Sequence, residues 1–116
     1  MSGAVSWNLQ LAVRDGRLGD FRSLMEEMVE STRSEPGTRA YEWFLSEDGA
    51  KCYILELYRD SQALSSHLAN IRDLYAPLFE LAQITRIEVF GAASEEVKQA
   101  HIPGTVFHDY WAGTRC

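Results

Sequence analysis

The chain has 116 residues, of which 46% are hydrophobic and 24% charged, and a formal net charge of -6. This length predicts one globular domain and excludes a second domain of ordinary size. The acidic balance argues against a nucleic-acid partner, because phosphate binding needs clustered lysine and arginine. No apolar run approaches the roughly 20 residues that cross a bilayer, and the N-terminus lacks the features of a signal peptide. The sequence therefore predicts a cytoplasmic protein that does not bind membranes.

The first elements are a strand and an amphipathic helix. Apolar residues at every second position from Trp7 to Val13 predict a strand with one buried face. Asp20 is the expected N-cap of the helix that follows, whose apolar residues recur at helical spacing: Phe21, Leu24, Met25, Met28 and Val29. Pro36 and Gly37 then form a turn that ends this helical region.

Residues 38–46 and 52–58 are rich in aromatic and other strand-favouring residues and predict a β-hairpin. A three-residue loop with Gly49 in the left-handed position places Ser46 opposite Ala50. In this register one face carries Glu42, Phe44, Cys52, Ile54, Glu56 and Tyr58, and the other carries Tyr41, Trp43, Leu45, Tyr53, Leu55 and Leu57. A loop length that differs by one residue from this expectation would move Glu56 to the opposite face from Glu42.

The remaining elements are two helical stretches, a strand and a tail. Asp60 and Ser61 predict the start of a helix with one stripe formed by Ala63, Leu64, His67 and Leu68. A further helical stretch over residues 70–83 should break just before Pro77, which is tolerated in the first turn of a new segment. Residues 84–90 alternate again and predict the fourth strand.

The order of elements predicts an α+β fold, a split βαββαβ arrangement of an antiparallel sheet with helices on one face. Because the hairpin strands are apolar on both faces, the second face should be covered by another copy of the chain in a two-fold homodimer. A short helix is expected after Ser94, and residues 105–111 should form an added strand or extended arm. The aromatic residues of this arm, Phe107, Tyr110 and Trp111, predict that it packs on the partner subunit.

Several of these segments resemble the antibiotic biosynthesis monooxygenase (ABM) domain family, which includes quinol-type monooxygenases. The resemblance covers roughly residues 5–92 and lies in Glu35-Pro36-Gly37-Thr38, Tyr41-Glu42-Trp43, residues 56–61, His67-Leu68 and residues 85–91. It implies a ferredoxin-like dimeric α+β barrel over residues 1–92, with residues 93–116 as a C-terminal helix and arm. It also implies oxygenation of electron-rich aromatic compounds by dioxygen, without metal, flavin or haem, in a pocket between helices and sheet.

Such chemistry needs a base, hydrogen-bond donors that hold the substrate anion, and an apolar pocket that excludes water. His67 is the best candidate for the base, since neutral imidazole titrates near physiological pH and this residue lies on the inward stripe of its helix. A histidine hydrogen-bonded within the core is the alternative. Glu42 and Glu56 would share a face near Tyr58 and hold a proton between them. Alternatively, one of them pairs with an arginine, namely Arg39, Arg59 or Arg86.

Other residues are expected around this centre. Trp43 and Tyr58 are predicted to form the pocket wall, and Asn8 and Asn70 to supply donors. The sequence predicts no metal site, because His101 and His108 lie away from any carboxylate cluster at ligand spacing. Cys52 and Cys116 show neither ligand spacing nor a disulfide framework.

The sequence thus predicts a homodimeric, cofactor-independent monooxygenase that acts on a quinol-like or polyphenolic compound. Two alternatives remain open. One is haem degradation on the same scaffold, for which Asn8 and a helix histidine would be the relevant residues. The other is a non-catalytic dimer that binds a small ligand or serves a stress response.

Overall fold

The computed structural model describes residues 3–99 and 102–114, so His101 and Cys116 lie outside the described residues. The elements in chain order are β1 (Val5–Val13), α1 (Leu18–Thr32), β2 (Thr38–Leu45), β3 (Lys51–Tyr58), α2 (Ser61–Asn70), the 3-10 turn η1 (Arg72–Leu74), α3 (Tyr75–Leu81), β4 (Ala82–Gly91), α4 (Glu95–Gln99) and β5 (Val106–His108). This order confirms the predicted split βαββαβ arrangement. Among the described residues, no helix is both long and apolar enough to cross a membrane.

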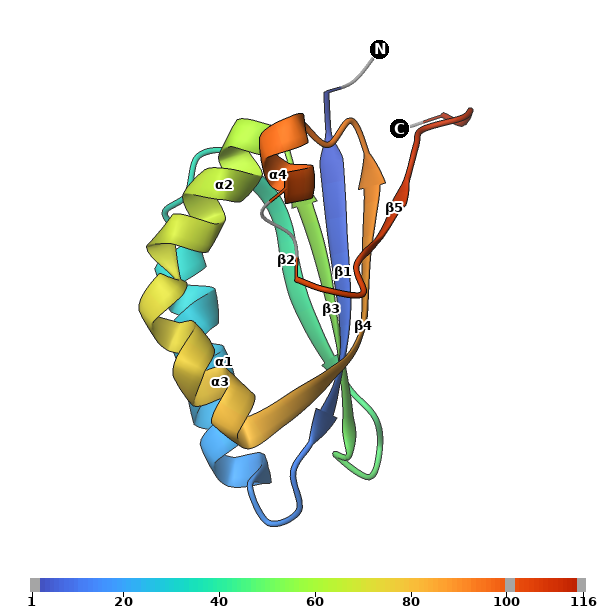
Figure 1. The fold of residues 1–116 in the computed structure, drawn as a ribbon. Coiled ribbons are helices and arrows are strands. Elements are labelled where there is room, and N and C mark those ends of the chain that lie inside the picture. Colours follow the sequence, from blue (N-terminus) through green and yellow to red (C-terminus); the bar gives the residue numbers. More distant parts are fainter. Residues whose placement is uncertain (1–2, 100–101, 115–116) are drawn as a thin grey trace.

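Within these residues the strands form one sheet in the order β2-β3-β1-β4-β5. The first four strands pair antiparallel, and β5 joins the outer edge of β4 in parallel. Helices α1, α2 and α3 cover one face of the sheet (Figure 1). The predicted added strand therefore exists and extends the sheet of its own chain. Beyond it, Tyr110 and Trp111 are 59% and 96% exposed, and the contact of this arm with a partner stays a prediction.

The core lies between the sheet and the helices, as the apolar patterns predict. Alternate residues of β1, including Trp7, Leu9 and Leu11, are buried against α1, which contributes Phe21 and Met28. Burying such side chains stabilises the fold by roughly 1.5 to 3 kcal/mol each. The sheet thereby acquires one helix-covered face and one open face.

The ends of the helices follow local chemistry, with one exception. Helix α2 begins as predicted, because the Asp60 carboxylate accepts a hydrogen bond from the Ala63 amide at 2.8 Å. The break before Pro77 is also confirmed, since α3 begins at Tyr75 and holds the proline in its first turn. The predicted N-cap of α1 is wrong. Arg17 occupies that position and Asp20 lies in the first turn, where a carboxylate still interacts favourably with the helix dipole.

The predicted hairpin register is wrong by one residue. Leu45 pairs with Cys52, and the Ser46 amide donates to the Lys51 carbonyl at 2.9 Å, so the loop has one residue more than expected. The Asp48 carboxylate stabilises this longer loop by accepting bonds from the Ser46 hydroxyl at 2.7 Å and the Ala50 amide at 2.9 Å.

In the observed register, each side chain of β2 lies on the opposite face of the sheet, relative to β3, from the one predicted. Trp43 and Tyr41 now share the helix-covered face with Ile54 and Glu56, whereas Glu42 lies on the open face beside Leu55. Four large apolar side chains on this open face are 37 to 49% exposed: Phe44, Tyr53, Leu55 and Phe90. Glu42 and Glu56 therefore point to opposite sides of the sheet and form no carboxylate pair.

Gly37 allows α2 to pack closely on the turn before β2. A Cβ atom at this position would lie 2.5 Å from the Cβ of Ala63. We expect Gly37→Ala to lower the free energy of unfolding by about 1 to 3 kcal/mol, because the helix must move away. Urea denaturation measures this change.

Two further variants control this prediction. Gly19→Ala introduces a methyl group that meets nothing within 4 Å and should not destabilise the fold. Ala63→Gly removes the clashing methyl group and should partly restore the stability of Gly37→Ala. Equal stability of the two alanine variants would contradict the close packing.

Candidate functional site

A buried histidine and a partly buried glutamate connect α2 to the turn before β2. The His67 side chain is fully buried, and its Nδ1 lies 2.9 Å from Oε1 and 3.2 Å from Oε2 of Glu35. Because a carboxylate can only accept, Nδ1 must carry the hydrogen, which leaves Nε2 as the acceptor of the neutral ring. Glu35 also accepts from the Thr38 hydroxyl and from Nδ2 of Asn70, each at 2.6 Å. These bonds fix both the orientation and the tautomer of the imidazole.

A second glutamate faces the other ring nitrogen. Glu56 on β3 is 3% exposed, and its Oε1 lies 3.5 Å from Nε2 of His67. The same oxygen accepts a hydrogen bond from the Tyr58 hydroxyl. Burial raises the pKa of Glu56 to about 8, and Glu35 adds to this increase while the Tyr58 bond opposes it. At neutral pH, Glu56 is therefore a protonated acid.

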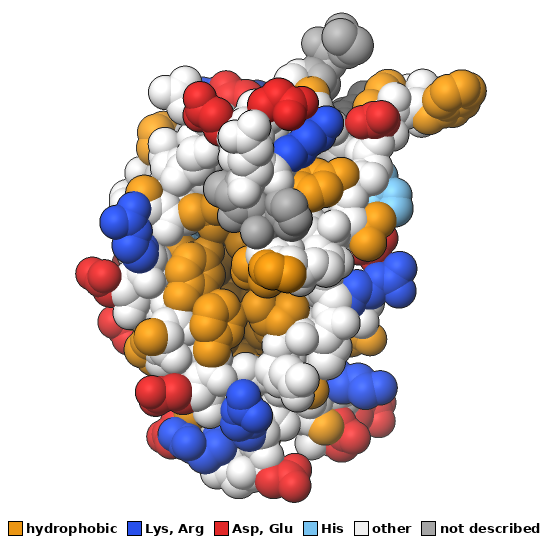
Figure 2. All heavy atoms as spheres, in the orientation of Figure 1, with side chains coloured by type: hydrophobic (Ala, Val, Ile, Leu, Met, Phe, Trp, Pro, Cys, Tyr) orange, Lys and Arg blue, Asp and Glu red, His pale blue; other side chains and the backbone are white. Residues whose placement is uncertain are grey.

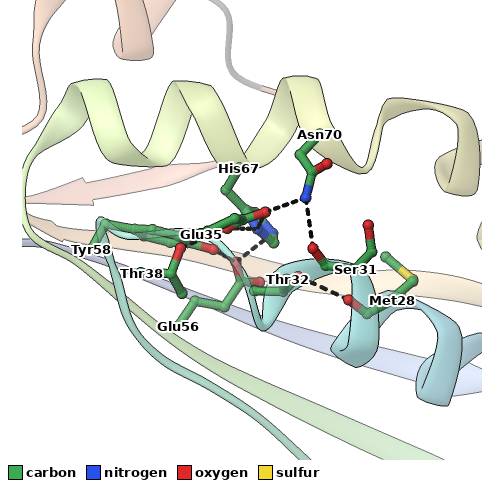
Figure 3. A network of polar contacts seen from close by, with 9 residues as sticks. All are labelled: Met28, Ser31, Thr32, Glu35, Thr38, Glu56, Tyr58, His67 and Asn70. Atoms are coloured by element: carbon green, nitrogen blue, oxygen red, sulfur yellow. Dashed lines mark hydrogen bonds and ion pairs between the residues drawn. The ribbon is translucent and has the colours of Figure 1, made fainter.

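Figure 3 shows the imidazole of His67 in contact with both Glu35 and Glu56. Burial lowers the pKa of His67 below its usual value, and the contact with Glu35 only partly opposes this decrease. The ring is consequently neutral at pH 7. A neutral imidazole and a protonated carboxyl group then lie 3.5 Å apart. Such a pair can supply both a base and an acid at the same pH.

Aromatic rings enclose this acid–base pair. The rings of Tyr41 and Tyr58 lie 4.8 and 5.2 Å from the imidazole, centre to centre, and Trp43 contacts Tyr41 edge-on at 5.8 Å. Burial raises the pKa values of both tyrosines far above 10, and Glu56, which is ionised at the high pH where a phenol titrates, adds to this effect. Both phenols therefore remain protonated at neutral pH, and Tyr58 donates to Glu56.

An apolar cavity of about 280 Å³ lies between the helices and the sheet. Figure 2 shows this region as a hollow lined by hydrophobic side chains. The described residues that line it include Trp7, Leu64, Leu68, Tyr75, Phe79, Val89, Val97, Ile102 and Phe107. Leu64 lies one turn before His67 on the buried side of α2. His67 and Glu56 are themselves not among the described residues that line the cavity; Leu64 and Leu68, on the same helix as His67, are. Residues after β4 form one cavity wall.

Comparison with known proteins identifies the family. The family model described as antibiotic biosynthesis monooxygenase (ABM) matches residues 5–101. The chain belongs to the ABM family. This assignment confirms the resemblance and the ferredoxin-like α+β fold that it implied.

Individual members of the family show how far the similarity extends. The crystal structure of MupZ from Pseudomonas fluorescens has a TM-score of 0.85 at 25% identity, covering 100% of this chain and 91% of MupZ. A protein named "Putative monooxygenase Rv0793" from Mycobacterium tuberculosis is 39% identical over 46 residues, or 40% of this chain. That match spans 46% of the relative, somewhat less than half of its length. SnoaB, a cofactor-independent oxygenase from Streptomyces nogalater, shares the fold with a TM-score of 0.69 at 17% identity, covering 80% of this chain and 96% of SnoaB.

The structure brings together part of the predicted site of this ABM protein. His67, Glu56 and Tyr58 meet directly, and Asn70 joins them through Glu35. Trp43 lies near them through Tyr41 but does not line the cavity. Tyr58 also lies outside the cavity lining, because its hydroxyl is directed to Glu56.

Two predicted residues lie elsewhere. Glu42 is exposed on the open face of the sheet, so its predicted pairing with Glu56 is wrong. Asn8 lies on the same open face, where its Oδ1 accepts a bond from the Ser6 hydroxyl at 3.1 Å. Both residues are separated from His67 by the sheet.

Sequence reasoning missed Glu35 as a member of the site. The residue belongs to the Glu35-Pro36-Gly37-Thr38 segment that carried the family resemblance, but a glutamate in a turn is ordinarily exposed. Thr38, three positions later, was the local indication that this carboxylate is held in place.

The potential metal-ligating side chains of the described residues do not form a metal site. Across residues 3–99 and 102–114, no group of three or more His, Cys, Asp or Glu side chains is arranged to hold a metal ion. His108 instead contacts Oε2 of Glu88 through its Nε2 at 2.8 Å and stacks on Phe90, which holds β5 against β4.

The protonated state of Glu56 predicts a pH dependence of stability. Between the pKa of 4.5 expected in the unfolded chain and the folded pKa of about 8, the folded protein binds the additional proton. Stability therefore falls as pH rises through this interval, by up to about 1.4 kcal/mol per pH unit. Glu56→Gln should remove this contribution, since an amide does not titrate and its carbonyl can still accept from Tyr58.

Urea denaturation of native protein and variant between pH 5 and pH 8.5 measures the difference. Glu42→Gln is the matched control, because it makes the same change on the open face, and it should keep the native slope. If Glu56→Gln also kept the native slope, Glu56 would not be a protonated acid in the fold.

Proposed function

We propose that this ABM protein is a cofactor-independent monooxygenase that oxidises a quinol-like or polyphenolic aromatic compound with dioxygen. The observation that carries the proposal is the buried His67 and Glu56 pair, 3.5 Å apart and next to an apolar cavity. A purely structural histidine needs one partner, whereas this one has a fixed tautomer and an acceptor nitrogen with no hydrogen bond among the described residues.

The chemistry assigns a task to each group. A phenol that loses its proton can transfer an electron to dioxygen directly. The resulting radicals combine, one oxygen atom enters the substrate, and the other leaves as water with two hydrogen atoms of the substrate. No external reductant is required. His67 accepts the first proton, Glu35 orients the ring, and Glu56 returns a proton to the reduced oxygen.

The cavity contributes by excluding water. Most of its lining side chains are apolar, and electrostatic interactions are stronger in such surroundings than in water. The names of two similar proteins support the same chemistry, because SnoaB is a cofactor-independent oxygenase and Rv0793 carries a monooxygenase name.

Loss of the base should abolish turnover without unfolding the protein. His67→Asn keeps a donor for Glu35 but removes the base, so oxygen uptake with a panel of quinols and anthrone-like phenols should fall by at least about 100-fold. Glu42→Gln changes a carboxylate on the other face of the sheet and should retain native uptake. An oxygen electrode measures both rates.

The same oxygen-uptake measurement on protein treated with a chelator completes this test. Uptake that persists after metal removal and falls only in His67→Asn supports the proposal. No uptake by folded native protein with any substrate would refute it and favour a non-catalytic ligand-binding protein. Uptake that His67→Asn leaves unchanged would remove His67 from the mechanism.

We also propose that the protein is a homodimer formed through the open face of the sheet. Phe44, Tyr53, Leu55 and Phe90 expose their apolar side chains there, and monomers rarely expose such groups together. Their two-fold pairing would bury this face and place Asn8 and Glu42 at the interface. The exposed Tyr110 and Trp111 would then pack on the partner subunit, as the sequence predicts.

Charge on the open face should separate the subunits. Leu55 is 42% exposed there, and Leu55→Glu would bury a carboxylate at the interface. We expect this variant to sediment as a monomer in analytical ultracentrifugation. Phe79→Glu is the control, since Phe79 is 40% exposed but belongs to α3 on the helix side. A native monomer, or a dimer that survives Leu55→Glu, would refute the interface.

A further inference from the structure

The Tyr75 hydroxyl is a buried polar group that the acid–base pair does not explain. It has no hydrogen-bond partner among the described residues. A buried tyrosine hydroxyl ordinarily finds a partner, and leaving one unsatisfied costs about 1 to 3 kcal/mol. An orphaned group of this kind therefore calls for a functional explanation.

The position of this residue indicates what its partner is. Tyr75 begins α3 immediately after the η1 turn, and its ring stacks on Phe79 with centres 5.9 Å apart and planes inclined by 12°. Both rings line the 280 Å³ cavity. The stacking orients the phenol at the cavity wall without using its hydroxyl.

The other polar side chains that line the cavity are already solvated or bonded. Ser65 and Glu96 are exposed to solvent. The Thr105 hydroxyl donates to the Ile102 carbonyl at 2.6 Å. Among the described lining residues, the Tyr75 hydroxyl is thus the buried hydroxyl without a hydrogen-bond partner; the Trp7 indole also borders the cavity.

The electrostatic surroundings decide which role the hydroxyl can play. Burial raises the pKa of Tyr75 well above its usual value, and Glu56 and Glu35, both ionised at the high pH where a phenol titrates, raise it further. The hydroxyl therefore keeps its proton at neutral pH and can act as a donor.

We infer that Tyr75 is a substrate-binding residue whose hydroxyl donates a hydrogen bond to the oxygen of a compact aromatic alcohol, or of its anion, held in the cavity. The volume of about 280 Å³ lies just below the ~300 to 1,000 Å³ that ligand pockets occupy, which favours a ligand of one or two fused rings. This inference rests on the proposed function in taking the cavity as the substrate site.

Binding of 2-naphthol, with naphthalene as the comparison ligand that lacks the oxygen, tests the inference without turnover. Fluorescence titration of the native protein should show tighter binding of 2-naphthol than of naphthalene. In Tyr75→Phe the dissociation constant of 2-naphthol should rise about fivefold to tenfold, which corresponds to one hydrogen bond. The dissociation constant of naphthalene should stay unchanged.

Thermal unfolding of the ligand-free variants separates a binding role from a structural one. Tyr75→Phe removes a hydroxyl without a described partner, so its melting temperature should equal or exceed that of native protein. Tyr58→Phe is the matched control, because it removes the donor to the buried Glu56 and should lower the melting temperature.

Three results would overturn the inference. These are equal affinity of 2-naphthol for native protein and Tyr75→Phe, equal affinity of the native protein for the two ligands, and a Tyr75→Phe variant as destabilised as Tyr58→Phe. Absent oxygen uptake together with the expected binding pattern would refute only the monooxygenase proposal.

Discussion

The structure depends on one buried contact, the hydrogen bond from Nδ1 of His67 to the Glu35 carboxylate. It joins α2 to the turn that leads into β2, two segments 32 positions apart in sequence. Thr38 and Asn70 bind the same carboxylate, so that each of its two oxygens accepts a hydrogen bond besides the contact with His67. A buried carboxylate is tolerated only with such partners. The close packing allowed by Gly37 and the capped start of α2 both serve to keep this geometry.

The carboxyl groups of Glu35 and Glu56, on either side of His67, have different roles. Glu35 is surrounded by donors, whereas Glu56 has the Tyr58 hydroxyl and little else, so burial dominates its titration. Identical side chains on either side of one imidazole thus become an orienting group and an acid. The difference arises from the neighbouring hydroxyl, amide and imidazole side chains rather than from the glutamates themselves.

Much of the fold followed from the sequence, because apolar periodicity reports which side of each element is buried. The His67 stripe, the Asp60 cap and the Pro77 break are local patterns and were predicted correctly. The hairpin register was not, since the Asp48 carboxylate stabilises a loop one residue longer than Gly49 alone suggested. That single residue moved Glu42 out of the site. Glu35 escaped prediction because its contacts with His67 and Asn70 result from tertiary packing between segments far apart in the sequence.

The parallel strand β5 has a consequence for how this scaffold can diversify. It holds Ile102, Thr105 and Phe107 in one wall of the cavity, while the acid–base pair belongs to β3 and α2. One wall of the cavity and the proton chemistry are therefore encoded in separate stretches of the chain. Substitutions in the C-terminal stretch can change which molecules fit while the reactive groups remain in place. That part of ligand choice can accordingly evolve independently of reactivity.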